Sequence, residues 1–188
     1  MVVVKALADA LLKIDPNVNL LIRPYPHAHA FDEYKELLDL PNIEFDNVHF
    51  EGQQMSYRPD DANEKYQKIS AAEIFVHMGS TIGLESSYLK TPVIHLVLDD
   101  LDFGRNENDQ QHISYTVNQR HLQKYMLSTA SPNVIRSSKD LVSTIAAALE
   151  QPSKFLAYNR ELSKITELLP MCKIANRITQ EIRSTITV

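Results

Sequence analysis

The 188-residue chain has only one cysteine and four glycines, and it has no tryptophan. A single cysteine, Cys172, excludes an internal disulfide and a zinc site built from thiolates, and it is typical of a reducing compartment. No apolar run approaches the roughly 20 residues that a membrane-spanning helix needs. The first residues include Lys5 and Asp9 within a short apolar patch, which is unlike a signal peptide. We therefore expect a cytoplasmic protein, either free or at the inner face of the membrane.

The chain also lacks any block of lysine or arginine. Its formal net charge is −5, which disfavours general nucleic-acid binding. A phosphorylated small molecule needs only a few local donors, so an acidic protein can still bind one. Three common motifs are absent as well: GxxxxGK[ST], GxGxxG after a strand, and GxSxG. Their absence disfavours P-loop ATPases, typical NAD enzymes and serine hydrolases.

Short apolar runs alternate with segments of helical periodicity along the chain. The predicted strands are 19–23, 43–45 with a continuation to 50 left open, 74–78, 93–98 and 133–136. The predicted helices are 2–13, 32–40, 63–70, 82–90, 122–127, 141–150 with a cap at 137–140, 153–169 and 171–185. This alternation predicts one α/β domain over 1–188, a Rossmann-like three-layer sandwich with a mostly parallel sheet and extra C-terminal helices at 151–188. The chain begins with a helix, whereas a nucleotide-binding fold usually begins with a strand.

The segment 74–98, IFVHMGSTIGLESSYLKTPVIHLVL, is the most informative part of the sequence. It predicts a strand, a turn, a helix and a second strand, with Gly79, Ser80 and Thr81 in the turn. In a parallel sheet this turn lies at the carboxyl edge, where free N–H groups and the helix dipole favour a phosphate. The hydroxyls of Ser80 and Thr81 would then donate to phosphate oxygens. The alternative is an ordinary turn in which one hydroxyl caps the helix.

Three further side chains fit the same edge, each with an alternative. Glu85 lies about one turn inside the helix and could accept hydrogen bonds from the two hydroxyls of a ribose, or it is a solvated acid that favours the dipole. Arg23 ends a strand and could bind a phosphate through two N–H groups, or it makes a surface salt bridge. His77 precedes the turn and could contribute to the site, or it is a core histidine. Gly79 and Gly83 would leave room for an approaching ligand.

A metal site is not predicted. His27 and His29 are two residues apart and have no evident third ligand. Asp99, Asp100 and Asp102 follow the strand 93–98 and could hold a metal–diphosphate, but an acidic loop is usually only solvated. The polar loop 99–121 that contains them is long, and long loops are often functional.

Two segments in this order resemble a known family. Arg23-Pro24-Tyr25-Pro26 follows a predicted strand, and AAEIFVHMGSTIGLESSYLKTPVIHL follows a predicted helix. Together they resemble the carboxyl-terminal half of GT-B fold glycosyltransferases. The nearest branch is the one that includes capsule and surface-polysaccharide enzymes and the CDP-glycerol glycerophosphotransferases of teichoic-acid synthesis. The resemblance covers 19–98 by motif and the later helices only by their order.

The resemblance implies a donor site. Ser80 and Thr81 would hold the diphosphate of a nucleotide-sugar or CDP-glycerol-type donor, Glu85 would bind its ribose, and Arg23 would lie near the phosphates. The donor is a substrate, so no cofactor is implied. Tyr25 stands where the family usually has histidine, and we therefore assign no catalytic residue.

Two smaller departures from the family pattern concern the second segment. Glu73 stands where the family usually has aspartate, and Lys90-Thr91 replaces the usual Gly-Lys before proline. Neither change removes the resemblance.

Such enzymes work in a cleft between two domains. We expect this chain to be the donor-binding half of such an enzyme, without the amino-terminal acceptor domain and without the first strand of its own sheet. Alone it would bind a donor and catalyse nothing, and its partners would be the acceptor domain, a separate chain or a second copy of itself. Two alternatives remain: a UDP-sugar 2-epimerase-like domain, which shares the fold and a ribose-binding glutamate, and a non-catalytic α/β module that binds a partner protein.

Overall fold

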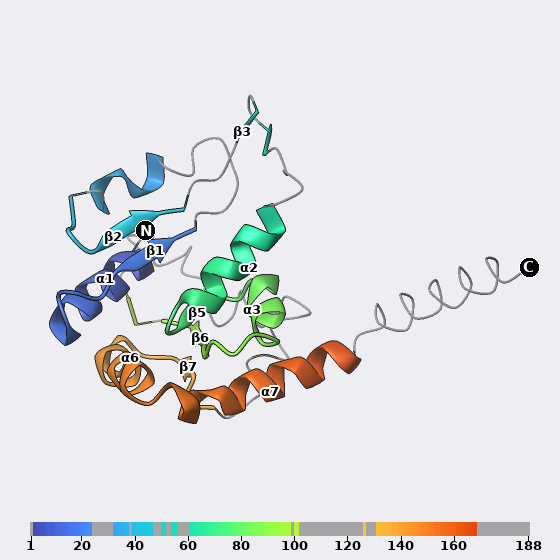
Figure 1. Cartoon of the computed structure of the whole chain (residues 1–188). Coiled ribbons are helices and arrows are strands. Elements are labelled where there is room, and N and C mark those ends of the chain that lie inside the picture. Colours follow the sequence, from blue (N-terminus) through green and yellow to red (C-terminus); the bar gives the residue numbers. More distant parts are fainter. Residues whose placement is uncertain are drawn as a thin grey trace, which may run out of the picture.

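The computed structural model describes residues 2–23, 32–37, 39–46, 50–51, 54–55, 61–98, 100–101, 126 and 131–168 (Figure 1). The helices are α1 (Val2–Ile14), α2 (Asp61–Ala71), α3 (Thr81–Ser86), α6 (Leu141–Glu150) and α7 (Pro152–Leu168), with 3₁₀ helices η1 (Asp32–Leu37) and η3 (Ser138–Asp140). The strands are β1 (Leu20–Ile22), β2 (Ile43–Phe45), β3 (Phe50–Glu51), β4 (Gln54–Met55), β5 (Phe75–His77), β6 (Val93–Leu96) and β7 (Val134–Ile135).

Among the described residues, two of the three sheets are parallel. β1 pairs with β2, and β5, β6 and β7 form a second sheet in that order. β3 and β4 form a small antiparallel hairpin. In the larger sheet the register places His77 of β5 opposite His95 of β6. The predicted α/β fold with a mostly parallel sheet is confirmed.

The central strand β6 has helices on both of its faces. Ile94 and Leu96 pack in a buried cluster with α1 and α6. Val93 faces the other way and packs with Leu84 of α3 and Leu162 of α7. A strand that is buried on both faces explains the unbroken apolar run 93–98 and completes the predicted three-layer arrangement.

Helix α1 is amphipathic, as its periodicity predicts, and it covers one face of both parallel sheets. Its buried residues include Val3, Leu7 and Leu11. The cluster that they form also receives Leu20 of β1 and Val76 of β5. α1 therefore connects two sheets that share no hydrogen-bonded strand pair among the described residues.

Two buried asparagines attach α7 to the sheet. The side-chain oxygen of Asn159 accepts the N–H of Val93 at 3.0 Å, and its amide group donates to the carbonyl of Thr91 at 2.7 Å. The amide of Asn133 donates to the carbonyls of Val93 and Phe155, both at 2.8 Å. These bonds satisfy backbone groups that helix packing would otherwise leave buried without partners.

The observed bounds differ from the predicted ones in a few places. The helix predicted for 82–90 ends at Ser86. The N–H groups of residues 87–89 donate to carbonyls three residues earlier, as in turns, and not four residues earlier, as in an α-helix. The possible continuation of 43–45 is a separate strand, β3, and β4 lies where no strand was predicted. Most of the loop 99–121, most of the helix 122–127, and the helix 171–185 with Cys172 lie outside the described residues.

None of the helices within the described ranges combines the length and apolar character needed to cross a membrane.

Candidate functional site

Two parallel strands, β1 and β2, end at charged residues. Arg23 follows β1 and Asp46 follows β2. The Asp46 carboxylate is buried and forms ion pairs with both Arg23 and Lys68 of α2. The backbone N–H of Asp46 also donates to the carbonyl of Ile22 at 2.8 Å. Asp46 therefore holds two cations at the carboxyl ends of β1 and β2.

A third ion pair lies where α2 meets α3. Lys65 Nζ is 2.7 Å from Glu85 Oε2, and the Tyr66 hydroxyl donates to the same oxygen at 2.8 Å. Partial burial alone would raise the pKa of Glu85, but the hydrogen bonds from Lys65 and Tyr66 outweigh it and lower that pKa. Partial burial would likewise lower the pKa of Lys65, but the bond to Glu85 and the neighbouring Tyr66 raise it. Glu85 is thus an ionised carboxylate at neutral pH.

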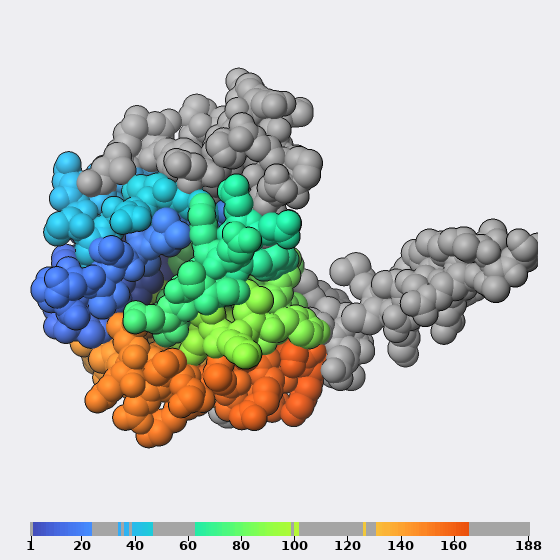
Figure 2. All heavy atoms as spheres, viewed as in Figure 1, coloured from blue at the N-terminus to red at the C-terminus, as the bar shows by residue number. Residues whose placement is uncertain are grey.

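Helix α2 carries two of the three basic residues in these ion pairs, Lys65 and Lys68. Lys65 and Lys68 are three positions apart, which places them on one face of the helix. We define the charged edge as Arg23, Asp46, Lys65, Lys68 and Glu85. It contains three cationic side chains and two carboxylates, so it has one positive charge in excess. Figure 2 shows α2 at the surface between the residues of α1 and β1 and those of α3.

The turn between β5 and α3 has the backbone that a small residue permits. Gly79 has φ 82°, a conformation that disfavours any other residue. Ser80 is the N-cap residue of α3, but its hydroxyl makes no capping hydrogen bond. Ser80 and Thr81 are both exposed. The capping alternative is therefore not what the structure shows for Ser80, and both hydroxyls face solvent-accessible space.

His77 is buried and contacts this turn. Its Nδ1 accepts the N–H of Gly79 at 3.1 Å, which places the ring hydrogen on Nε2. A Cβ on Gly83 would lie 2.4 Å from the His77 ring, so α3 can approach β5 only because Gly83 has no side chain. The space that we assigned to a ligand at Gly83 is filled by His77.

His77 and His95 form a buried stacked pair, with ring centroids 4.4 Å apart. The Tyr158 hydroxyl donates to the carbonyl of Met126 at 3.3 Å and lies 3.5 Å from His95 Nδ1, which can therefore donate to it. Burial, and then the charge of Arg136, lower the pKa of His95 to about 4. Burial and the neighbouring His95 lower the pKa of His77 well below its ordinary value. Both rings are neutral at pH 7, and they belong to the core.

Asp100 also has a structural role. Its carboxylate accepts the backbone N–H of Ser138 at 2.9 Å and the Ser137 hydroxyl at 2.8 Å, at the start of η3. Slight burial would raise the pKa of Asp100, but these hydrogen bonds lower it. Asp99, Asp102, His27 and His29 lie outside the described residues, and the described ones contain no group of three metal ligands.

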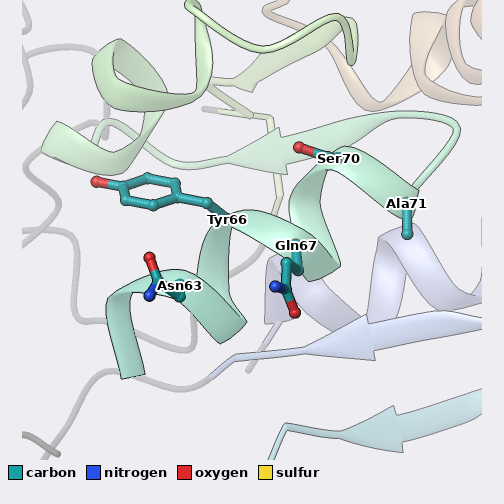
Figure 3. Close-up of a pocket in the computed structure, with 5 residues that line it drawn as sticks. All are labelled: Asn63, Tyr66, Gln67, Ser70 and Ala71. Atoms are coloured by element: carbon teal, nitrogen blue, oxygen red, sulfur yellow. The ribbon is translucent and has the colours of Figure 1, made fainter. Parts of the chain in front are cut away.

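A shallow hollow lies on the outer face of α2 (Figure 3). The described residues that line it all belong to that helix: Asn63, Tyr66, Gln67, Ser70 and Ala71. Only Tyr66 connects this hollow with the charged edge, through its bond to Glu85. The described part of this lining does not by itself define a binding site.

Two of the residues singled out in the sequence are linked through α2: Glu85 pairs with Lys65, and Arg23 shares the Asp46 carboxylate with Lys68. Arg23 lies at the charged edge, Glu85 joins it through α2, and Gly79, Ser80 and Thr81 follow β5 as predicted. Sequence reasoning missed a second group: Asp46, Lys65, Tyr66 and Lys68. Asp46 carries the same signal as Arg23, since it is a charged residue directly after a predicted strand. Tyr25, which belongs to the family motif, lies outside the described residues.

No protein-family model, no curated protein sequence and no solved structure matches this chain.

Proposed function

We propose that the charged edge and the turn Gly79–Thr81 bind the diphosphate and ribose of a nucleotide-activated donor. The chain would be the donor-binding part of a glycosyltransferase or glycerophosphotransferase in surface-polysaccharide synthesis. The observation that carries the proposal is the convergence of Arg23, Lys65 and Lys68 from distant parts of the sequence, with one positive charge in excess.

Arg23 and Lys68 have donors left for a phosphate. Their side chains are 32% and 41% exposed, whereas the Asp46 carboxylate between them is 3% exposed. A guanidinium has five N–H donors and an ammonium has three, so one bond to Asp46 does not exhaust either group. Asp46 acts here as a positioning residue that fixes both cations at the edge of the sheet.

Glu85 has an oxygen available for a ribose hydroxyl. Lys65 and Tyr66 both bond to Oε2. A carboxylate has about four acceptor positions on its two oxygens, so Oε1 can accept from a sugar hydroxyl without breaking either bond. The low pKa of Glu85 keeps it an acceptor at neutral pH.

The chemistry of transfer fits these groups. When the donor group leaves, negative charge grows on the nucleoside diphosphate, and cations that are already fixed beside it stabilise that charge. The acceptor and any general base would come from outside this chain. The isolated chain is therefore expected to bind a nucleoside diphosphate but to transfer nothing.

Calorimetric titration tests this proposal. UDP, CDP and GDP are titrated into the full chain, and one of them should bind saturably. Arg23→Gln should weaken that binding at least about tenfold, because a charge-assisted bond contributes roughly 1.5–3 kcal/mol. Glu85→Gln should abolish any preference for the ribonucleotide over its 2′-deoxy form.

The matched control is Glu161→Gln, which removes an exposed carboxylate paired with Lys164 on α7. This variant should bind the nucleoside diphosphate with the same affinity as the unchanged chain. The proposal is wrong if no nucleoside diphosphate binds to the folded chain, or if the control lowers the affinity as much as Arg23→Gln does.

A further inference from the structure

His77 makes a hydrogen bond that connects the buried sheet to the turn 79–81. Its Nδ1 accepts the N–H of Gly79 at 3.1 Å, and both residues are buried. Met78, which lies between them, is exposed, and so are Ser80 and Thr81. The bond therefore lies on the inner side of the turn, whereas the two hydroxyl-bearing residues lie at the surface.

The turn at Gly79 needs a contact of this kind, because glycine has the widest choice of backbone conformations. The structure selects one of them, with φ 82°. The peptide group between Met78 and Gly79 is trans and planar, so a bond that holds the Gly79 N–H inward also turns the Met78 carbonyl away from His77. The Ser80 hydroxyl makes no capping bond that would fix the turn from its other end.

The imidazole ring of His77 is itself held in place by two neighbours. It stacks on the ring of His95 in β6, with centroids 4.4 Å apart. On α3, a Cβ added to Gly83 would lie only 2.4 Å from Cε1 and 2.7 Å from Nδ1 of His77. A ring packed this closely keeps its orientation, so the direction in which Nδ1 points is set before any ligand binds.

Histidine is a costly residue for this buried position. The Nε2 atom of His77 is buried and has no hydrogen-bond partner in the described part of the chain. A buried polar group without a partner lowers stability, and an apolar side chain of similar size would avoid that loss. What a histidine adds here is the acceptor at Nδ1, which an apolar residue cannot supply to Gly79.

We propose that His77 is a positioning residue of the donor site, and that its Nδ1 holds the turn 79–81 in the conformation that presents Ser80 and Thr81 to a phosphate. His77 itself would not touch the donor. This inference rests on the proposed function, because it assigns a role within that site.

Two variants that differ only in the acceptor test the proposal. His77→Asn places a carbonyl oxygen where Nδ1 lies, and His77→Leu places a methyl group there. Both remove the rest of the ring, so they share the loss of packing. Hydrogen exchange at the Gly79 amide is measured without nucleotide, and the affinity for UDP, CDP and GDP is measured by calorimetry. Backbone ¹H–¹⁵N spectra show that each variant is folded.

Loss of the acceptor should affect both measurements. His77→Leu should speed exchange at the Gly79 amide about fivefold or more, because one hydrogen bond no longer protects it. It should weaken nucleotide binding by about the same factor, since the ligand must then order the turn. His77→Asn should leave both quantities close to those of the unchanged chain.

Three results would overturn the proposal. Equal exchange at Gly79 in the two variants would show that the acceptor does not hold the turn. Different exchange but equal nucleotide affinity would overturn the positioning role and leave the proposed function standing. If the unchanged chain binds no nucleotide, the proposed function fails, and the positioning role fails with it.

The unchanged chain offers a test that needs no variant. The ¹⁵N spectrum of its histidine rings should show the hydrogen of His77 on Nε2 at neutral pH, because Nδ1 accepts from Gly79. A hydrogen on Nδ1 would overturn the proposal even if neither variant folds.

Discussion

The sheet β5–β6–β7 and the pair β1–β2 use similar residues and have different surroundings. Every residue of β6 is buried, with helices on both faces. In β1, by contrast, Leu21 is 46% exposed, and its partner Glu44 in β2 is exposed as well. How much a leucine in a parallel strand contributes to stability therefore depends on whether helices cover its side chain. The larger sheet supplies more of the core, whereas the smaller pair has exposed residues within its strands, Leu21 and Glu44.

Titratable groups show the same contrast. In the larger sheet, His77 and His95 are buried, stacked and neutral. Beside the smaller pair, Arg23 and Lys68 are ion-paired with Asp46 and remain partly exposed. The protonation of buried titratable groups changes the stability of the fold, whereas partly exposed cations can bind a ligand. Variants in each region test this contrast between the buried larger sheet and the partly exposed pair β1–β2.

The largest expected effect is on stability in the closed sheet. Leu96→Ala should lower the free energy of unfolding by about 2–5 kcal/mol, because it leaves a cavity between β6 and the helices. Leu21→Ala, the matched change in β1, should cost about 1 kcal/mol or less. Urea denaturation of both variants measures the difference. Equal losses would contradict the contrast between the two sheets.

A smaller effect follows from the buried histidines. The unfolded chain protonates His95 near pH 6.5, but the folded chain does so only near pH 4. The unfolded state therefore binds more protons between these values, and stability falls as the pH drops through this window. His95 alone accounts for about 3 kcal/mol over the whole window, with His77 acting in the same direction.

Urea denaturation at pH 7, 6 and 5 measures this slope, above the range where carboxylates titrate. His95→Gln should make the dependence visibly shallower, even if it lowers stability at pH 7. An unchanged slope in this variant would show that other groups cause the pH dependence.

The smallest effect concerns the contact between α3 and β5. Gly83→Ala should destabilise the fold by about 1–3 kcal/mol, because the added methyl group meets the His77 ring. In a thermodynamic cycle, His77→Ala should relieve this cost, so that the double variant loses less than the sum of the single ones. Strictly additive losses would mean that the contact is unimportant.

Local patterns in the sequence predicted much of the fold. The apolar run 93–98 predicted a strand, and the periodicity of 2–13 predicted a helix with one apolar face; β6 and α1 confirm both. The length of α3 was predicted less well. Residues 82–90 have the composition of a helix throughout, but the chain changes to three-residue turns after Ser86. The residue at which a helix ends depends on tertiary contacts.

The candidate site was harder to predict, because its contacts join distant residues. Arg23 and Asp46 are 23 positions apart, and Lys65 and Glu85 are 20 apart. Nothing local to either pair indicates its partner. The position of each charged residue after a strand or on a helix face could be read from the sequence, but the pairing could not. For the same reason, Gly83 was assigned to a ligand although its neighbour is His77.

The most direct test of the account is to locate bound nucleotide on the protein. Backbone ¹H–¹⁵N NMR spectra of the full chain are recorded while UDP, CDP or GDP is added. The account predicts saturable shifts that are largest at Gly79, Ser80 and Thr81 and at Lys65 and Lys68, with residues near Glu161 unchanged. Saturable shifts centred on α7, or no shifts with any of the three nucleotides, would contradict it.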